Sequence, residues 1–312
     1  MRSQALEIDG RVGRLAASID VPEAVTGYAL LAHCFSCGKD QATAADLGRA
    51  LVRLGWAVVR VDFAGLGGSD GDFGENTTFS GGVDDIVRVA DHMRSEFEAP
   101  VLLVGHSLGG AAALAAASRI PEVGAVVAVG APFSPDHLIV DPVAADGLPR
   151  TGRPARVLIG DQYVTRGVRL LDDLTNLGHG VRLGDLDSAV LIMQDPDDEV
   201  VPFDHAVRIR EAVGPRAALV PIEGGHFLRR SADRRRVADL VSVWATPFVK
   251  GGPKIRAPAT ARRNPPGERS SSGSRVPVGW PRRSERRGSS GAPMSPPPPA
   301  RPELGPSPTS CC

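Results

Sequence analysis

Three residues that could together activate a nucleophile stand far apart in this chain: Ser107, Asp198 and His226. A serine hydroxyl is a weak nucleophile until a base removes its proton, and histidine is the usual base. A carboxylate beside that histidine fixes its tautomer and stabilises the imidazolium. We therefore expect attack on an acyl carbon, through an acyl-enzyme on Ser107, if the fold brings the three side chains together.

The surroundings of Ser107 favour the role of nucleophile. The sequence VLLVGHSLGG spans residues 101–110, and its first four residues predict a short buried strand. Residues 105–109 then fit G-x-S-x-G, and the Ala-rich stretch that follows predicts a helix. A strand, a tight turn of small residues and a helix form the context in which this motif exposes a serine at the end of a strand. The alternative is a Gly-rich turn whose serine caps the helix.

The acid is expected just after a strand that lies C-terminal to Ser107. The sequence LIMQDPDDEVVP, residues 191–202, has an apolar strand followed by an acidic turn. Asp195, Asp197 and Asp198 compete for the role. We prefer Asp198, which lies four residues before Pro202, and Asp197 is the second choice. The alternative is that all three are solvated turn residues and that one caps the next helix.

The histidine is expected after the last strand, and His226 follows the predicted strand 217–222 on a loop with Gly224 and Gly225. Glycines allow such a loop to bend an imidazole back over the sheet edge. The alternative is a histidine on an ordinary surface loop. Two backbone donors would complete the site as an oxyanion hole, and we expect the N–H groups of Leu108 and Phe35.

The rest of the pattern predicts the α/β class with a mostly parallel sheet. Residues 5–21 predict two antiparallel strands that turn near Asp9-Gly10, and a glycine-rich loop covers residues 65–74. Segment 132–186 interrupts the alternation of strands and helices and is interpreted as a small cap with one helix at about 168–177. The remaining elements are strands at 27–33, 57–63, 124–129, 189–193 and 217–222, and helices at 40–54, 83–97 and 235–249, with 208–213 in a further helix.

The composition separates a body from a tail near residue 250. The chain has equal numbers of basic and acidic residues, but residues 251–312 hold 11 basic residues, 3 glutamates and 14 of the 27 prolines. Such a segment buries too little apolar surface to offset its chain entropy, so we expect a hydrolytic body at 1–250 and a disordered tail at 251–312. The tail is either a genuine disordered segment or the product of out-of-frame translation.

Composition also limits the setting and the partners. The first residues lack the apolar stretch of a secretion signal, no run could span a bilayer, and we expect a cytoplasmic protein. The basic tail could attract nucleic acid, but its one aromatic residue, Trp280, argues against stacking on single strands, and no nucleic-acid or membrane partner is expected. The partner that the chemistry needs is a small acyl substrate. Serine chemistry of this kind requires neither a cofactor nor a metal.

The body resembles the α/β-hydrolases. The resemblance rests on AHCFSCGKD around Cys34, GHSLGG at Ser107, and DPDDEVVP with GGHF farther on, and DFAGLGGSDGDF at residues 62–73 resembles a Gly-rich loop of that superfamily. With LLDDL at 170–174, these motifs are similar to the hydrolase half of bacterial proteins that fuse an α/β-hydrolase to an OsmC-like peroxidase domain. The narrower resemblance covers roughly residues 3–250. It implies a serine esterase, or a serine-aminopeptidase-like hydrolase, that could also cleave amides or thioesters.

The sequence departs from this family in three places. Cys34 stands where many members have glycine and is expected to narrow the acyl pocket, and Asp195 replaces a small residue before the acid turn. After residue 250 nothing resembles an OsmC-like domain. An acyltransferase, or a non-catalytic partner of peroxide-detoxifying chemistry, is therefore an alternative function.

Several further residues have simpler interpretations. Cys34 and Cys37 form C-x-x-C, and we expect free structural thiols rather than a redox pair, since they lie in the predicted oxyanion loop. Zinc would need two further ligands that the sequence does not offer. His33 and His106 are expected to orient loops rather than transfer protons.

Overall fold

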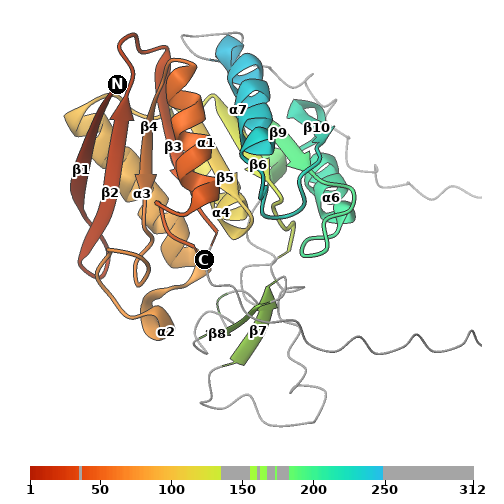
Figure 1. Ribbon diagram of the computed structural model, residues 1–312, viewed down its shortest axis with the longest axis horizontal. Helices are drawn as coiled ribbons and strands as arrows, with labels where there is room; N and C mark the ends of the chain where they lie inside the picture. Colours follow the sequence, from red (N-terminus) through yellow and green to blue (C-terminus); the bar gives the residue numbers. More distant parts are fainter. Residues whose placement is uncertain (35–36, 135–154, 160–161, 167–172, 174–182, 249–312) are drawn as a thin grey trace, which may run out of the picture. The chain divides into compact units, whose positions relative to one another are not determined.

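Eight strands form one twisted sheet at the centre of the described part of the chain. The structure, a computed structural model, describes residues 1–34, 37–134, 155–159, 162–166, 173 and 183–248. The strand order is β1-β2-β4-β3-β5-β6-β9-β10 (Figure 1). The pairs β1–β2 and β2–β4 are antiparallel, and every other neighbouring pair in this sheet is parallel. The predicted α/β class with a mostly parallel sheet is confirmed.

The first two strands form the predicted hairpin. β1 (Arg2–Asp9) pairs with β2 (Arg14–Val21), and the register places Asp9 opposite Arg14. The turn closes with a hydrogen bond from the Gly10 N–H to the Gly13 carbonyl. This hairpin extends the sheet away from the parallel strands, whose ends carry the candidate site.

The parallel strands are the continuous apolar runs of the sequence. Every residue of β4, β5, β6 and β9 is buried, as expected for strands with helices on both faces. Their observed ends lie within a few residues of the predicted ones. The strands are β3 (Gly27–Ala32), β4 (Trp56–Val61), β5 (Leu102–His106), β6 (Ala125–Val129), β9 (Ala189–Gln194) and β10 (Ala217–Pro221).

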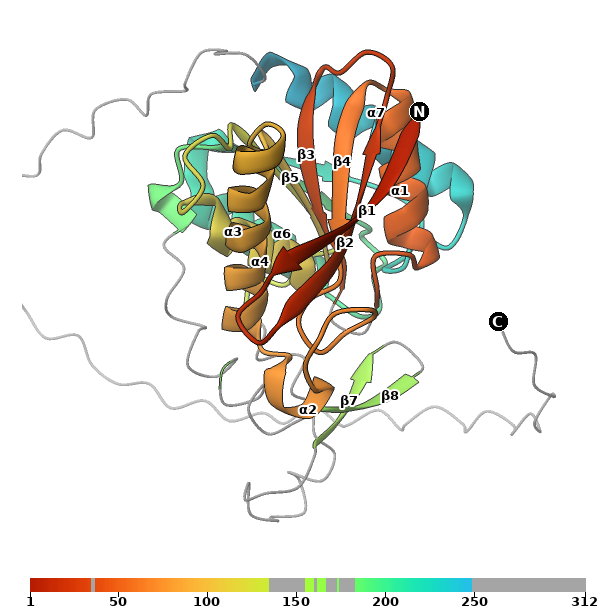
Figure 2. The same cartoon turned by 90° about the vertical axis from the view of Figure 1, so that its left-hand side faces the viewer.

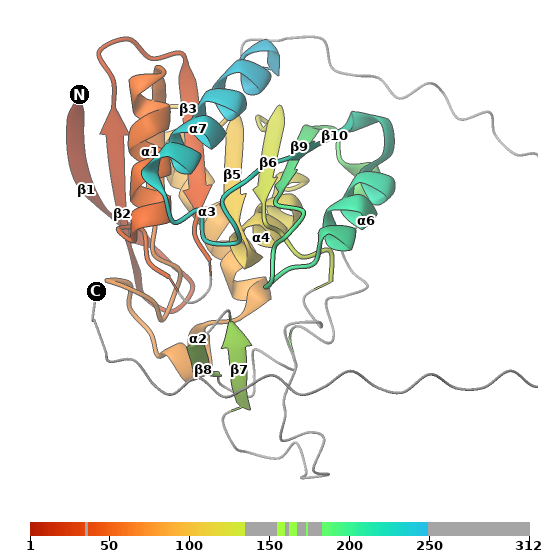
Figure 3. The ribbon, with the colours of Figure 1, turned by 45° about the vertical axis from the view of Figure 1, so that its right-hand side comes forward.

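Helices cover both faces of the sheet (Figures 2 and 3). One face packs against α3 (Phe79–Glu96), α4 (Leu108–Ala117) and α6 (Phe203–Val213), whose buried residues share one apolar core. The other face packs against α1 (Ala42–Arg53) and α7 (Ser231–Ala245), with a second core around Trp56. The two cores hold the strand ends in fixed relative positions.

Two helices, α3 and α7, have boundaries four residues away from the predicted ones. α3 begins four residues earlier than expected, because the Thr78 hydroxyl accepts a hydrogen bond from the Gly81 N–H and starts the helix before its two glycines. α7 spans 231–245 instead of 235–249, and the 3-10 turn η5 (Thr246–Phe248) follows it. The predicted glycine-rich loop, 65–74, overlaps at its end with the short helix α2 (Phe73–Asn76).

Segment 132–186 is described only in part. β7 (Ala155–Ile159) and β8 (Gln162–Arg166) form an antiparallel pair that the sequence interpretation missed. The helix predicted at 168–177 lies outside the described residues, apart from Asp173. The carboxylate of Asp173 accepts hydrogen bonds from the N–H and the hydroxyl of Ser80 in the first turn of α3, at 2.8 and 2.7 Å.

The tail also lies outside the described residues, which end at 248. Its predicted boundary and disorder stay predictions. Among the described helices, none combines the length and apolar character needed to cross a bilayer.

Candidate active site

Ser107 occupies a strained turn between β5 and α4. Its φ of 57° and ψ of −130° are unusual for a residue with a side chain. The glycines two residues before and after it permit close approach of backbone atoms. A Cβ atom on Gly105 would lie 2.4 Å from the Gly109 carbonyl oxygen, and one on Gly109 would lie 2.3 Å from the His33 carbonyl oxygen. Positions 105 and 109 of the G-x-S-x-G pattern therefore have no room for a side chain.

The hydroxyl of Ser107 does not cap α4, although Ser107 is the N-cap residue of that helix. It lies 3.1 Å from Nε2 of His226. The capping alternative considered for this serine is therefore wrong, and the hydroxyl is placed for proton transfer to an imidazole.

His226 also contacts Asp198 through its other ring nitrogen. Nδ1 lies 2.9 Å from Oδ2 of Asp198, and both side chains are buried. Burial opposes ionisation of Asp198, but the hydrogen bond and charge of His226, with the N–H groups of Val200 and Val201, keep the pKa of this carboxyl below its ordinary value. An ionised Asp198 accepts a hydrogen bond from the Nδ1–H of His226, which leaves Nε2 unprotonated and able to accept the proton of Ser107.

The geometry distinguishes the three candidate aspartates. Asp198 is buried against His226, whereas Asp197 is exposed and its N–H donates to Oδ1 of Asp195. Asp195 has another contact: its Oδ2 accepts hydrogen bonds from the N–H groups of Gly224 and Gly225, at 2.9 and 2.6 Å. The substitution of a small residue by Asp195 thus links the acid turn to the loop that carries the histidine.

Two more hydrogen bonds hold that loop. His106 Nε2 donates to the carbonyl oxygen of His226 at 2.7 Å, and the Thr43 hydroxyl donates to the carbonyl oxygen of Phe227 at 2.8 Å. Gly130, with φ of 57°, passes close to the imidazole, since a Cβ there would lie 3.3 Å from Nδ1 of His226. The backbone around His226 is thus fixed from β5, α1 and the β9 turn.

His106 contributes to this support as a neutral residue. Burial and the nearby His226 lower the pKa of His106 to about 4. Burial likewise lowers the pKa of His33, whose Nδ1 donates to the Cys34 carbonyl oxygen at 2.6 Å. In both histidines a ring nitrogen bonds to loop backbone, in accordance with the prediction that they orient loops.

Leu108 is the first residue of α4, so its N–H has no partner within the helix and is free to act as a donor beside Ser107. The second expected donor, the Phe35 N–H, lies outside the described residues. Asp62 connects the residues after Cys37 to the glycine-rich loop. Its carboxylate accepts hydrogen bonds from the Lys39 N–H, the Lys39 ammonium group and the Gly68 N–H.

The C-x-x-C pair differs from expectation. Cys34 and Cys37 form a disulfide, so the prediction of free thiols is wrong. The Cys37 N–H donates a hydrogen bond to the Cys34 carbonyl oxygen, and the two Cα atoms lie 5.3 Å apart, within the range that a disulfide needs. The C-x-x-C spacing was visible in the sequence, but the distance between the two cysteines in the fold was not.

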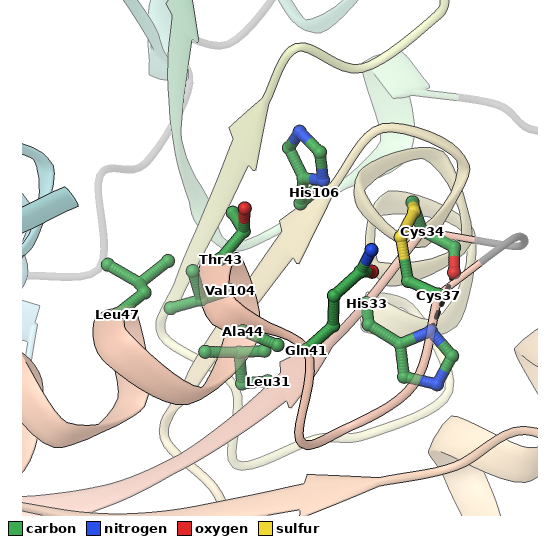
Figure 4. Close-up of a pocket in the computed structure, with 10 residues that line it drawn as sticks. All are labelled: Leu31, His33, Cys34, Cys37, Gln41, Thr43, Ala44, Leu47, Val104 and His106. Carbon is green, nitrogen blue, oxygen red and sulfur yellow. Dashed lines mark hydrogen bonds between the residues drawn. A yellow bond between two sulfur atoms is a disulfide. The ribbon is translucent and has the colours of Figure 1, made fainter. Parts of the chain in front are cut away.

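The disulfide borders a largely apolar pocket between β3, β5 and α1 (Figure 4). His33 and His106 also line it, together with Thr43, but none of Ser107, Asp198 and His226 does. In the part of the chain that the structure describes, no group of three or more His, Cys, Asp or Glu side chains is arranged to hold a metal ion.

Comparisons with known proteins identify the family of this chain. The family described as "Serine aminopeptidase, S33" matches residues 36–174. The esterase domain of a Rhodothermus marinus protein is 31% identical, with a TM-score of 0.64, and the match covers 80% of this chain and all of that one. No match is found among curated proteins.

Two more distant structures share the fold. A serine hydrolase from Xanthomonas campestris, described as lacking a lid, is 23% identical over 78% of this chain and 95% of its own, with a TM-score of 0.54. Est1E from Butyrivibrio proteoclasticus, solved with ferulic acid bound, is 21% identical over 77% of this chain and 97% of its own, with a TM-score of 0.61.

Proposed function

Because this chain belongs to the α/β-hydrolase superfamily, as a serine hydrolase of the esterase type, we propose that it cleaves a carboxylic ester through an acyl-enzyme on Ser107. The observation that carries the proposal is the continuous hydrogen-bonded series from Ser107 Oγ through the His226 ring to Asp198, buried at the end of three strands. Amides and thioesters have the same acyl carbon and are the next substrates to test.

The first half of the reaction forms the acyl-enzyme. His226 Nε2 takes the proton of the Ser107 hydroxyl while Oγ bonds to the acyl carbon of the ester. The carbonyl oxygen becomes an oxyanion that the Leu108 N–H can stabilise, with the Phe35 N–H as the proposed second donor. Each such donor contributes roughly 3–4 kcal/mol to transition-state stabilisation. The bond to the leaving alcohol then breaks, and the alcohol takes the proton from His226.

The second half returns the enzyme to its starting state. Water gives a proton to His226 Nε2 as it attacks the acyl carbon. The bond between the acyl carbon and Ser107 Oγ then breaks, the acid is released, and His226 returns the proton to Oγ. Asp198 stabilises the imidazolium in both halves, and its low pKa keeps it ionised in the range where His226 must act as a base.

The test combines a fluorophosphonate probe with hydrolysis of a p-nitrophenyl ester panel. We expect the wild type to be labelled and Ser107→Ala to lose labelling and hydrolysis, by roughly 10⁴-fold or more in kcat. Ser118→Ala changes an exposed serine just after α4 and should behave as wild type. Equal labelling of wild type and Ser107→Ala would overturn the proposal.

Product analysis with a competing alcohol separates hydrolysis from acyl transfer. A hydrolase releases mainly free acid, whereas an acyltransferase forms the new ester even when water is in large excess.

The narrower resemblance to OsmC-like fusion proteins has its own test. We propose that the gene encodes an OsmC-like domain in another frame after codon 250, and the absence of such a reading in both other frames would refute it.

A further inference from the structure

The last residue of β9, Gln194, is polar and completely buried. It ends the run AVLIMQ, whose other members are apolar, and none of its surface is exposed. Burial of an amide destabilises a fold unless the amide is hydrogen-bonded, so its contacts need an explanation.

The amide nitrogen of Gln194 has two acceptors. Nε2 lies 2.8 Å from Oδ2 of Asp198 and 2.8 Å from the carbonyl oxygen of Val201. A carboxylate and a carbonyl only accept hydrogen bonds, so the atom that faces them must be the nitrogen. The side-chain oxygen Oε1 of Gln194 has no hydrogen-bond partner among the described residues. The amide orientation of Gln194 thus makes hydrogen bonds to Asp198 and Val201 and leaves its own oxygen without one.

The hydrogen bond from Gln194 reaches Oδ2 of Asp198, the same oxygen that contacts His226. Oδ1 of Asp198 is held by the N–H groups of Val200 and Val201, while Oδ2 accepts from His226 and Gln194. Without the amide, Oδ2 would have one donor, His226 itself, and the carboxylate could turn away from the ring.

We propose that Gln194 is a positioning residue, which fixes the Asp198 carboxylate so that Oδ2 faces Nδ1 of His226. The inference rests on the proposed function and names a residue outside the three expected ones. Gln194 does not touch substrate and acts only through Asp198.

The first test replaces Gln194 by a side chain of similar length without the amide. Gln194→Met should lower kcat for p-nitrophenyl acetate about tenfold, because hydrogen bonds to charged groups are among the stronger ones, and KM should not change. Gln4→Met changes an exposed glutamine of β1 and should leave kcat as in wild type. An unchanged kcat in a folded Gln194→Met variant would overturn the proposal.

A double-mutant cycle tests whether Gln194 acts through Asp198. In the Asp198→Asn background, Gln194→Met should have little further effect on the rate of labelling of Ser107 by a fluorophosphonate, since the carboxylate that it positions is gone. If the two losses multiply instead, Gln194 acts elsewhere and the proposal is wrong.

Gln194→Glu gives a signature that packing alone would not produce. At lower pH the introduced carboxyl group is protonated and can donate a hydrogen bond to Asp198, whereas at higher pH two carboxylates face each other and repel. The ratio of variant to wild-type kcat should therefore fall as pH rises. If Gln194→Met does not fold, the pH dependence of this ratio decides, and a ratio that does not change with pH would refute the proposal.

Loss of labelling in Ser107→Ala, measured alongside, shows that the proposed function stands even where the inference about Gln194 fails.

Discussion

The turn that carries Ser107 and the loop that carries His226 are held in different ways. The turn is held by close backbone contacts, with glycines at 105 and 109 whose extra atoms would collide with neighbouring carbonyl groups. The histidine loop is held by hydrogen bonds from residues distant in sequence: Asp195, His106 and Thr43. The turn depends on the glycines two residues before and after the serine, and the loop depends on polar side chains supplied by other elements.

This difference has consequences for mutation. A steric constraint fails abruptly, because a backbone atom cannot move far without shifting a strand. A set of hydrogen bonds fails gradually, since each bond contributes separately. Substitutions in the turn should therefore affect folding, and substitutions around the loop should affect mainly the rate.

The largest effect is expected for Gly109→Ala. The added methyl group would lie 2.3 Å from the His33 carbonyl oxygen and 2.6 Å from that of Ala32, both backbone atoms. We expect a loss of about 3 kcal/mol or more in the free energy of unfolding, measured by urea denaturation. Gly184→Ala, at an exposed glycine whose added atom would have its nearest contact at 3.3 Å, should stay within about 0.5 kcal/mol of wild type. Equal stability of the two variants would show that the turn is not held sterically.

The second largest effect is the pH dependence of stability at His106. This residue ends β5, directly before Ser107, and its ring donates a hydrogen bond to the carbonyl oxygen of His226. Its pKa is about 4 in the folded protein against an ordinary value of 6.5, so the folded state favours the neutral ring. Its contribution to stability is complete above pH 6.5 and is lost as the pH falls towards 4, by about 3 kcal/mol. His106→Gln keeps a donor for the His226 carbonyl oxygen without titrating.

Unfolding free energies of both proteins at pH 7, 5.5 and 4 measure this contribution. The wild type should lose more stability than His106→Gln over that range, so the difference between them should shrink or reverse at pH 4. Parallel pH dependence in the two proteins would contradict the burial of a neutral imidazole at this position.

The smallest effect is expected for Asp195→Ala, which removes the acceptor of the Gly224 and Gly225 N–H groups. The loop should keep its other supports, so kcat should fall about tenfold with little change in stability. Asp197→Ala is the matched control, because this exposed side chain lies in the same acidic turn. If both variants keep the wild-type kcat on a p-nitrophenyl ester, the loop does not depend on Asp195.

The same difference explains what the sequence could predict. The strands, the hairpin and the position of Ser107 follow from local signals: apolar runs, Asp9-Gly10 and G-x-S-x-G. The contact of Asp198 with His226 was predicted from chain order, which works because parallel strands end at one edge of the sheet. The Phe35 donor stays a prediction.

The supports of the site were harder to predict. Neither Thr43 nor Gln194 carries a local signal. The partner of Thr43, Phe227, is distant in sequence, and the contact of Gln194 with Asp198 depends on the shape of the acidic turn, which packing sets. Asp195 did carry one, as a departure from the small residue of the family pattern, but its acceptor role needed the Gly224–Gly225 backbone to be in view. The disulfide similarly needed the positions of Cys34 and Cys37 in the fold.

The contact between Asp173 and Ser80 matters for engineering of the inserted segment. One carboxylate from this segment accepts two hydrogen bonds in the first turn of α3, where the helix dipole also favours negative charge. Chimeras that exchange residues 135–182 with the corresponding stretch of another hydrolase should therefore retain an acidic residue at this point. A graft chosen by length alone would remove the carboxylate and leave the two donors of Ser80 to water.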